Sequence, residues 1–330
     1  MQITIQAQTV PRMAAWLKNA RDLGIRDEAS LRELLNHPDY QVEFARYGDP
    51  NLPVCGIGVE EAVDFFLHFD EKKFENPRLD YKHEQFLAFY RDLDHRLEKM
   101  RLLQSVTAAD LLLVQRLLEN ALPEAVLKQV PEITVLLTVS IGNSMGWPYE
   151  HYVHFDAANL DTFHDKAEFL HVLAHELHHI LFPRLLPEDM TPQQYFFINF
   201  AFEGLAMHFC NNAATLDKPS KYPGESYGVD EESWQFYREQ HRELLERVLS
   251  DGERAKAMTM EQVEKLLEYY EQFTFTSLKT GVSQKVKQYP TYYMGCLLWG
   301  TIDGNLGTER LFQVLASKDG FMEAWKEAKQ

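Results

Sequence analysis

The stretch FLHVLAHELHHILFP, residues 169–183, places four histidines and one glutamate in an otherwise apolar segment. Apolar residues recur there at intervals of three and four, which is typical of an α-helix. The pattern predicts a buried helix over residues 162–181, with Thr162 and Asp165 as a capping box at its start and Pro183 after its end. Polar groups are costly inside a protein unless they are paired, so this helix is expected to carry chemistry.

His175, Glu176 and His179 form the pattern H-E-x-x-H. Histidines four residues apart project from one face of a helix, so both can reach a single zinc ion at about 2.0–2.1 Å. The glutamate between them is left free to take a proton from a water molecule that the ion activates. His171 and His178 are also at helical spacing from His175, but only the first pair brackets a glutamate correctly. We therefore interpret His171 and His178 as structural groups or as partners that hold the ligand residues in place.

A catalytic zinc needs three protein ligands and an open position. The metzincin continuation of the pattern is excluded, because Phe182 and Leu185 stand where a glycine and a third histidine would be. A second helix is predicted to start at Thr191 and to run through QQYFFINFAFEGLAMHFCNN, residues 193–212. Glu203 is its only acid and has apolar neighbours on every side. A carboxyl buried there is strongly penalised when ionised, or stays protonated, unless a cation meets it, which makes Glu203 the candidate third ligand.

H-E-x-x-H followed by a second helix with E-G-L-A, residues 203–206, resembles the gluzincin group of zinc metallopeptidases. More narrowly, it resembles bacterial families of predicted zinc-dependent peptidases of unknown function. The resemblance covers roughly residues 133–300 and implies one Zn²⁺ per chain, held by His175, His179 and Glu203, with Glu176 as general base. Zinc is the first choice for this ligand set, although the sequence leaves iron or manganese open. In the thermolysin-like branch an acid four residues after the glutamate orients a ligand histidine, but Met207 occupies that place here.

The resemblance also implies a hydrogen-bond donor to the oxyanion that develops during amide hydrolysis. Residues 289–304 resemble the Y-x-x-G-bearing helix found late in such peptidases, which makes Tyr292 and Tyr293 the candidates, with Gly295 allowing close helix approach. His208 is a rival donor. In this fold group an edge strand beside the active helix pairs with an extended peptide, and residues 151–157 are the matching segment. The alternative is a buried inner strand.

The rest of the chain predicts an α+β fold that is predominantly helical. Residues 2–6 alternate as a short strand does, residues 11–24 form a helix bounded by an early proline and a late glycine, and residues 133–141 read as a buried strand. We expect a mainly helical N-terminal part over residues 1–130. Residues 131–330 then form a zincin-like metallopeptidase part with a small sheet next to the H-E-x-x-H helix.

Composition limits the partners and the compartment. The chain has 330 residues and a formal net charge of −17, which disfavours nucleic acids and anionic membranes. The N-terminal sequence has no signal-peptide pattern, and Cys55, Cys210 and Cys296 form no CxxC pair, so we expect a cytoplasmic protein. The leading hypothesis is a hydrolase, a zinc metallopeptidase acting on peptides or proteins. The alternatives are a peptide-recognition or regulatory module that keeps its metal without turnover, and a metal-free helical scaffold. The oligomeric state is not readable from the sequence.

Overall fold

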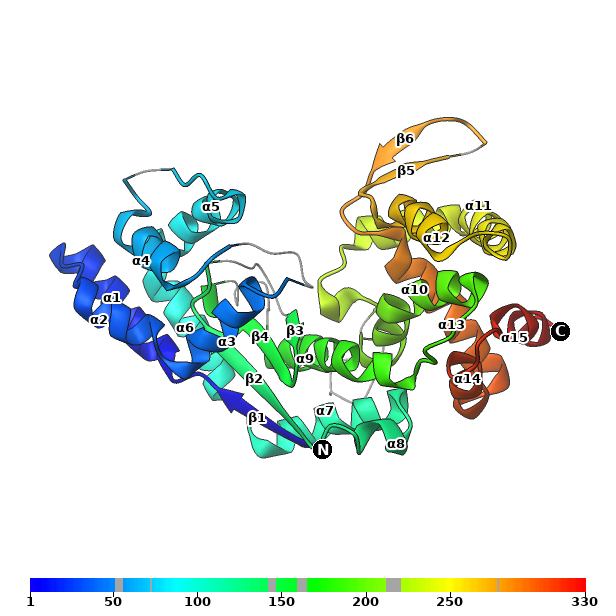
Figure 1. The fold of residues 1–330 in the computed structure, drawn as a ribbon, viewed down its shortest axis with the longest axis horizontal. Helices are drawn as coiled ribbons and strands as arrows, with labels where there is room; N and C mark the ends of the chain where they lie inside the picture. The colour runs from blue at the N-terminus through cyan, green and yellow to red at the C-terminus, as the bar shows by residue number, and fades with distance from the viewer. Residues whose placement is uncertain (51–55, 72, 142–146, 159–164, 212–220, 278) are drawn as a thin grey trace. The chain divides into compact units, whose positions relative to one another are not determined.

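The computed structural model describes residues 1–330 except 51–55, 72, 142–146, 159–164, 212–220 and 278 (Figure 1). The chain forms two compact units, each built from two segments. Unit 1 consists of Met1–Ala108 and Pro131–Lys166, and unit 2 consists of Ala109–Val130 and Ala167–Gln330. The chain passes between the units at three places, after Ala108, Val130 and Lys166. The assignment of separate roles to residues 1–130 and 131–330 stays a prediction.

Unit 1 contains a four-stranded sheet in the order β1-β2-β4-β3. The strands are β1 (Gln2–Gln6), β2 (Glu132–Thr138), β3 (Trp147–Tyr149) and β4 (Tyr152–Asp156). β1, β2 and β4 are parallel, and β3 pairs with β4 in the antiparallel direction. β2 is buried along nearly its whole length, as its aliphatic sequence predicts. The predicted strands at residues 2–6 and 133–141 are therefore confirmed, the second with an earlier end.

The predicted edge strand at residues 151–157 is wrong, and the alternative of an inner strand is confirmed. β4 pairs with β2 along its whole length on one side and with β3 over Tyr152, Val153 and His154 on the other, so it is an inner strand. The edge strand on that side of the sheet is β3. Alternation along residues 151–157 indicated a strand, but it carried no information about the number of neighbours.

Helices form the rest of unit 1 and supply much of its apolar core. Its helices are α1 (Thr9–Leu23), α2 (Glu28–Leu35), α3 (Pro38–Tyr47), α4 (Val59–His68), α5 (Pro77–Arg91) and α6 (Leu93–Gln104). α1 ends at Gly24 in the left-handed conformation, with φ 67°, which confirms the predicted glycine stop. Phe65 and Phe66 of α4 pack edge to face against Phe86 of α5. Aromatic pairs of this kind stabilise the core beyond the area they bury.

A buried polar cluster lies where β2 and β4 end. The Glu43 carboxylate accepts hydrogen bonds from the hydroxyls of Tyr47 at 2.6 Å, Thr138 at 2.6 Å and Ser140. Nε2 of His154 lies 2.6 Å from Oγ1 of Thr138. Because the Thr138 proton is donated to Glu43, the imidazole must donate to Thr138, which makes Nε2 the protonated nitrogen of His154. Every polar group named here is buried, so the bonds offset the cost of removing them from water.

The described residues of unit 2 are mainly helical. Its α-helices are α7 (Ala108–Ala121), α8 (Glu124–Leu127), α9 (Lys166–Leu181), α10 (Pro192–Ala206), α11 (Glu231–Ala255), α12 (Met260–Leu267), α13 (Pro290–Leu306), α14 (Thr308–Leu315) and α15 (Phe321–Ala328). The first residues of α7 and α9 belong to unit 1. Shorter elements are η2 (Phe182–Leu185), η3 (Met207–Asn211), η4 (Glu225–Tyr227), η5 (Glu268–Glu271), β5 (Thr274–Thr276) and β6 (Ser283–Lys285). The α+β, predominantly helical fold class is thus confirmed.

α10 and α13 run side by side in contact at the centre of unit 2 (Figure 1). α10 starts as predicted, with the Thr191 hydroxyl accepting from the backbone N–H of Gln194 at 3.1 Å and with Pro192 at its first position. Gly204 of α10 faces Gly295 of α13, where neither residue has a side chain to keep the backbones apart. In the part of the chain that the structure describes, no helix is both long and apolar enough to cross a membrane.

Candidate metal centre

α9 carries the H-E-x-x-H pattern into the interior of unit 2. The helix starts at Lys166 rather than at residue 162, and Thr162 of the predicted capping box lies outside the described residues. Its apolar residues are buried, as their spacing predicts, and so are His175 and Glu176. Burial of an acid and an imidazole within one turn requires partners for both, and these come from α10, η3 and η4.

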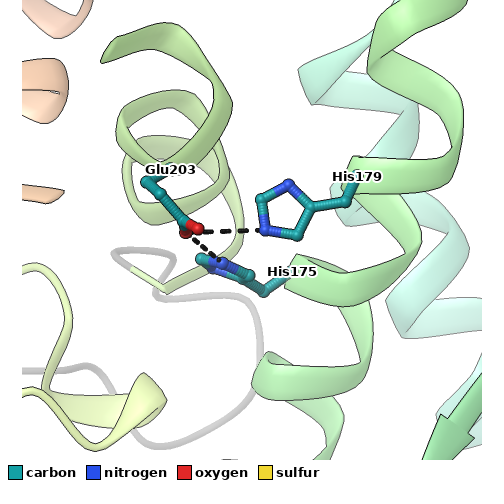
Figure 2. Close-up of side chains that lie close together, drawn as sticks. All are labelled: His175, His179 and Glu203. Atoms are coloured by element: carbon teal, nitrogen blue, oxygen red, sulfur yellow. Dashed lines mark hydrogen bonds and ion pairs between the residues drawn. The ribbon is translucent and has the colours of Figure 1, made fainter. Parts of the chain in front are cut away.

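Three predicted site residues lie close together. The side chains of His175 and His179 in α9 and of Glu203 in α10 point toward one another (Figure 2). Oε2 of Glu203 lies 3.0 Å from Nε2 of His175 and 3.5 Å from Nε2 of His179. Among the residues that the structure describes, these form a group whose ligand atoms all lie within 4.8 Å of one another.

The donor set fits a zinc ion. Two ligands held at about 2.0–2.1 Å in tetrahedral geometry are separated by roughly 3.3 Å, and the observed separations of 3.0 and 3.5 Å bracket that value. Two imidazoles and one carboxylate are also the ligands of one of the common catalytic zinc sites, which keep a fourth position open. The three residues thus have the chemistry and the spacing to hold the ion.

The electrostatics of the group favour an ionised Glu203. Burial acts to raise the pKa of Glu203, but the neighbouring histidines outweigh it and hold this pKa far below its usual range. Burial acts to lower the pKa of His179, but the charge and hydrogen bond of Glu203 outweigh it and raise this pKa. Glu203 therefore stays ionised, as a metal ligand must.

Glu176 lies beside the group and is held by a residue that the sequence analysis missed. The hydroxyl of Tyr227 in η4 donates to Oε1 of Glu176 at 3.2 Å, and the Tyr227 ring stacks on His175 with centroids 3.9 Å apart. Burial raises the pKa of Glu176, although the nearby histidines oppose the shift. Tyr227 follows Glu203 by 24 positions, beyond the reach of any helical periodicity, so no local pattern pointed to it.

The structure separates the two tyrosines predicted in α13. The buried Tyr292 ring lies parallel to those of Tyr227 and His175, at 5.8 and 6.5 Å between centroids, and its hydroxyl interacts with Tyr227 and Glu203. Tyr293 points elsewhere, against Trp234 at 5.1 Å and Tyr237 at 6.1 Å.

The other histidines singled out in the sequence, His171, His178 and His208, have other neighbours. His208 lies 2.8 Å from Asp303 of α13. Nδ1 of His171 contacts the backbone carbonyl of Cys210, and the His178 ring stacks on Phe182 with centroids 5.1 Å apart. Burial holds the pKa of His178 well below its usual value, so this ring is neutral. Cys210 and Cys296 are free thiols, whereas Cys55 lies outside the described residues.

Asn211 supplies a polar partner that the sequence analysis left unassigned. Its Oδ1 atom lies 2.7 Å from Nδ1 of His175, on the opposite side of the ring from Glu203. It is the last residue of η3, a π-helical turn in which α10 continues past Ala206. π-turns inside longer helices are frequent at functional sites, but the sequence carries no signal for one.

The fold and the site together define a predominantly helical α+β protein with a His-His-Glu candidate metal centre. Residues 31–330 match the family described as "Putative zinc dependent peptidase (DUF5700)". Since the match covers most of the chain, the protein belongs to this family. Comparisons with curated proteins and with solved structures find no match.

Proposed function

We propose that the protein is a zinc metallopeptidase of the gluzincin type, in which His175, His179 and Glu203 hold one Zn²⁺ and Glu176 is the general base. The observation that carries the proposal is the convergence of Nε2 of both histidines on one oxygen of Glu203, with Glu176 on the same helix. The family description supports a zinc-dependent peptidase in general terms.

When bound, zinc supplies a Lewis acid that polarises a peptide carbonyl and lowers the pKa of water. Glu176 takes the proton of the attacking water and later passes it to the departing amine. Its Oε1 accepts from Tyr227 at 3.2 Å, which leaves Oε2 outside that hydrogen bond. A carboxylate whose pKa is raised by burial holds a proton more readily than one in water, which suits a group that must carry it between two steps.

Tyr292 is the proposed donor to the oxyanion. Its hydroxyl already lies within reach of Glu203 and Tyr227, and burial raises its pKa well above its usual value, so it remains a neutral O–H donor. A preorganised donor in a site shielded from water stabilises developing charge more than solvent does. We favour Tyr292 over Tyr293 for this role, because the Tyr293 ring packs against Trp234 and Tyr237.

The proposed substrate is a peptide or protein, and the proposed location is the cytoplasm. The acidity of the chain supports the exclusion of nucleic acids and anionic membranes. The alternative function, a regulatory module without turnover, was supported by the absence of an orienting acid at position 207, which is Met207. Asn211 now meets His175 where that acid would act, and Glu176 is intact, so we do not favour this alternative.

The first experiment is to measure metal content by mass spectrometry in the wild type and in a His175→Ala/His179→Ala variant. A His95→Ala/His241→Ala variant is the matched control, because both of these histidines lie outside the site. We expect about one zinc per chain in the wild type and control, and none in the site variant. A quenched-peptide library then tests turnover, with Glu176→Gln expected to keep the zinc and lose hydrolysis. Equal zinc in all three proteins would remove the proposed metal centre.

A further inference from the structure

Asn211 is fully buried between a predicted metal ligand and η4. Its Oδ1 faces Nδ1 of His175 at 2.7 Å, and its Nδ2 faces Oγ of Ser226 at 3.3 Å. Ser226 in turn lies 3.1 Å from the backbone carbonyl of Asn211. The two residues thus make two contacts with each other, one through the amide of Asn211 and one through its main chain.

The hydroxyl of Ser226 determines which way the amide faces. A hydroxyl has one proton, and the carbonyl of Asn211 can only accept, so the Ser226 proton is donated there. Oγ is then left as an acceptor, and the group that approaches it must be a donor. The NH₂ of Asn211 therefore faces Ser226, and the amide oxygen faces His175.

This orientation fixes the proton on His175. An amide oxygen only accepts, so Nδ1 of His175 must carry a hydrogen and donate it. The neutral ring then has its lone pair on Nε2, the nitrogen that lies 3.0 Å from Glu203. A lone pair and a carboxylate oxygen at that distance repel each other unless a proton or a metal ion lies between them.

We propose that Asn211 is a positioning residue whose amide orientation is fixed by Ser226. It keeps the proton of His175 on Nδ1 and orients Nε2 toward the metal position. The inference rests on the proposed zinc function. It also explains why no acid is needed at position 207 to orient the ligand histidine. The π-helical turn brings the amide of Asn211, four positions after Met207, to the His175 ring. A neutral amide orients the ring without adding a third carboxylate beside Glu176 and Glu203.

The tautomer is tested first in metal-free protein with ¹⁵N-labelled histidine. In the wild type we expect Nδ1 of His175 to carry a hydrogen-bonded proton, whether or not Nε2 is also protonated. Asn211→Leu should lose that signal. A wild-type His175 with a bare Nδ1 and a proton only on Nε2 would overturn the proposal.

Zinc affinity, measured by competition with a chelator, is the second readout. Asn211→Leu should bind zinc about 10–100-fold more weakly, because loss of a ligand's orienting partner has that effect. Asn211→Asp keeps an acceptor and should bind within about 10-fold of wild type, while Ser226→Ala should fall between the two. The matched control is Gln193→Leu, which removes a buried amide that donates to Gly252 at 2.9 Å away from the site. It should lose stability without losing affinity.

The outcomes separate this proposal from the proposed function. Equal zinc affinity in wild type and Asn211→Leu overturns the positioning role while leaving the metal centre intact. The protein could instead bind no zinc while Nδ1 of His175 carries a proton that is lost in Asn211→Leu. That result would support the Asn211–His175 assignment and contradict the proposed peptidase function. Equal losses of affinity in Asn211→Leu and Gln193→Leu would show a general effect on folding and also overturn the proposal.

Discussion

Gly204 and Gly295 bring the backbones of α10 and α13 into direct contact. A Cβ on Gly204 would lie 2.1 Å from the carbonyl carbon of Gly295, and one on Gly295 would lie 1.9 Å from the carbonyl oxygen of Phe200. Glu203 immediately precedes the first glycine, and Tyr292 stands three residues before the second. The contact between the two glycines therefore sets how closely the helix with the proposed third ligand approaches the helix with the proposed donor.

Gly295→Ala should destabilise the protein strongly. The new methyl group would meet backbone, which cannot rotate away, so we expect a loss near the upper end of the range for overpacking, about 3 kcal/mol. Urea denaturation checks this. Gly304→Ala is the matched control, because it lies in the same helix with open space around the added Cβ. It should stabilise the protein by up to about 1 kcal/mol, since alanine favours the helix over glycine. Similar losses in both variants would contradict the close contact.

The sequence predicted part of this contact between α10 and α13, because two short patterns indicated it. E-G-L-A and Y-x-x-G each place a glycine at a fixed offset from a functional side chain, and Gly295 was expected to permit close approach. Helical periodicity likewise predicted α9 and α10, where burial depends on residues near one another in the chain. His175, His179 and Glu203 were identifiable because titratable groups in apolar helices need partners.

Other parts of the site depend on contacts that leave no local pattern. Tyr227 and Asn211 reach the site through η4 and a π-helical turn, and neither element has a sequence signal. The place of β4 inside the sheet likewise depends on where β3 pairs. Alternation in a strand shows that it has two different faces, whereas the number of its hydrogen-bonded neighbours is decided by tertiary structure.

Glu203→Gln should lower zinc affinity by more than about 100-fold, beyond the 10–100-fold that loss of an orienting partner costs. The change replaces the charged oxygen on which both histidines converge with a neutral amide. Glu176→Gln is the matched variant. It likewise removes a carboxylate close to His175, in this case from α9, but it should leave zinc affinity nearly unchanged. Competition with a chelator measures both. Full affinity in Glu203→Gln would mean that the third ligand is another residue.

Tyr292→Phe should lower kcat by about 10²–10³-fold on a peptide found in the library screen, as expected for loss of one oxyanion donor. KM should change much less, because the donor acts mainly in the transition state. Tyr293→Phe is the neighbouring control. Its ring packs against Trp234 and Tyr237, so kcat should stay within about 2-fold of wild type. A larger fall for Tyr293→Phe than for Tyr292→Phe would reverse the assignment.

The buried His154 should make unit 1 less stable in mild acid. Burial lowers the pKa of His154 to about 3, helped by Arg46 and Lys82 and opposed by Asp156. In the unfolded chain a histidine titrates near about 6.5, so between pH 6.5 and 3 only the unfolded state takes up this proton. The stabilising contribution of a neutral His154 is thus fully present above pH 6.5 and falls as the pH drops.

A His154→Gln variant isolates this contribution, because glutamine also offers an N–H to Thr138. Burial raises the pKa of Glu43 and Asp156, which act in the opposite direction, but these groups are common to both proteins. We expect the variant to be less stable than wild type at pH 7.5, and the difference to shrink by about 1.4 kcal/mol at pH 5.5. Denaturant unfolding at the two pH values measures it. A difference that is independent of pH would mean that His154 is protonated in the folded protein.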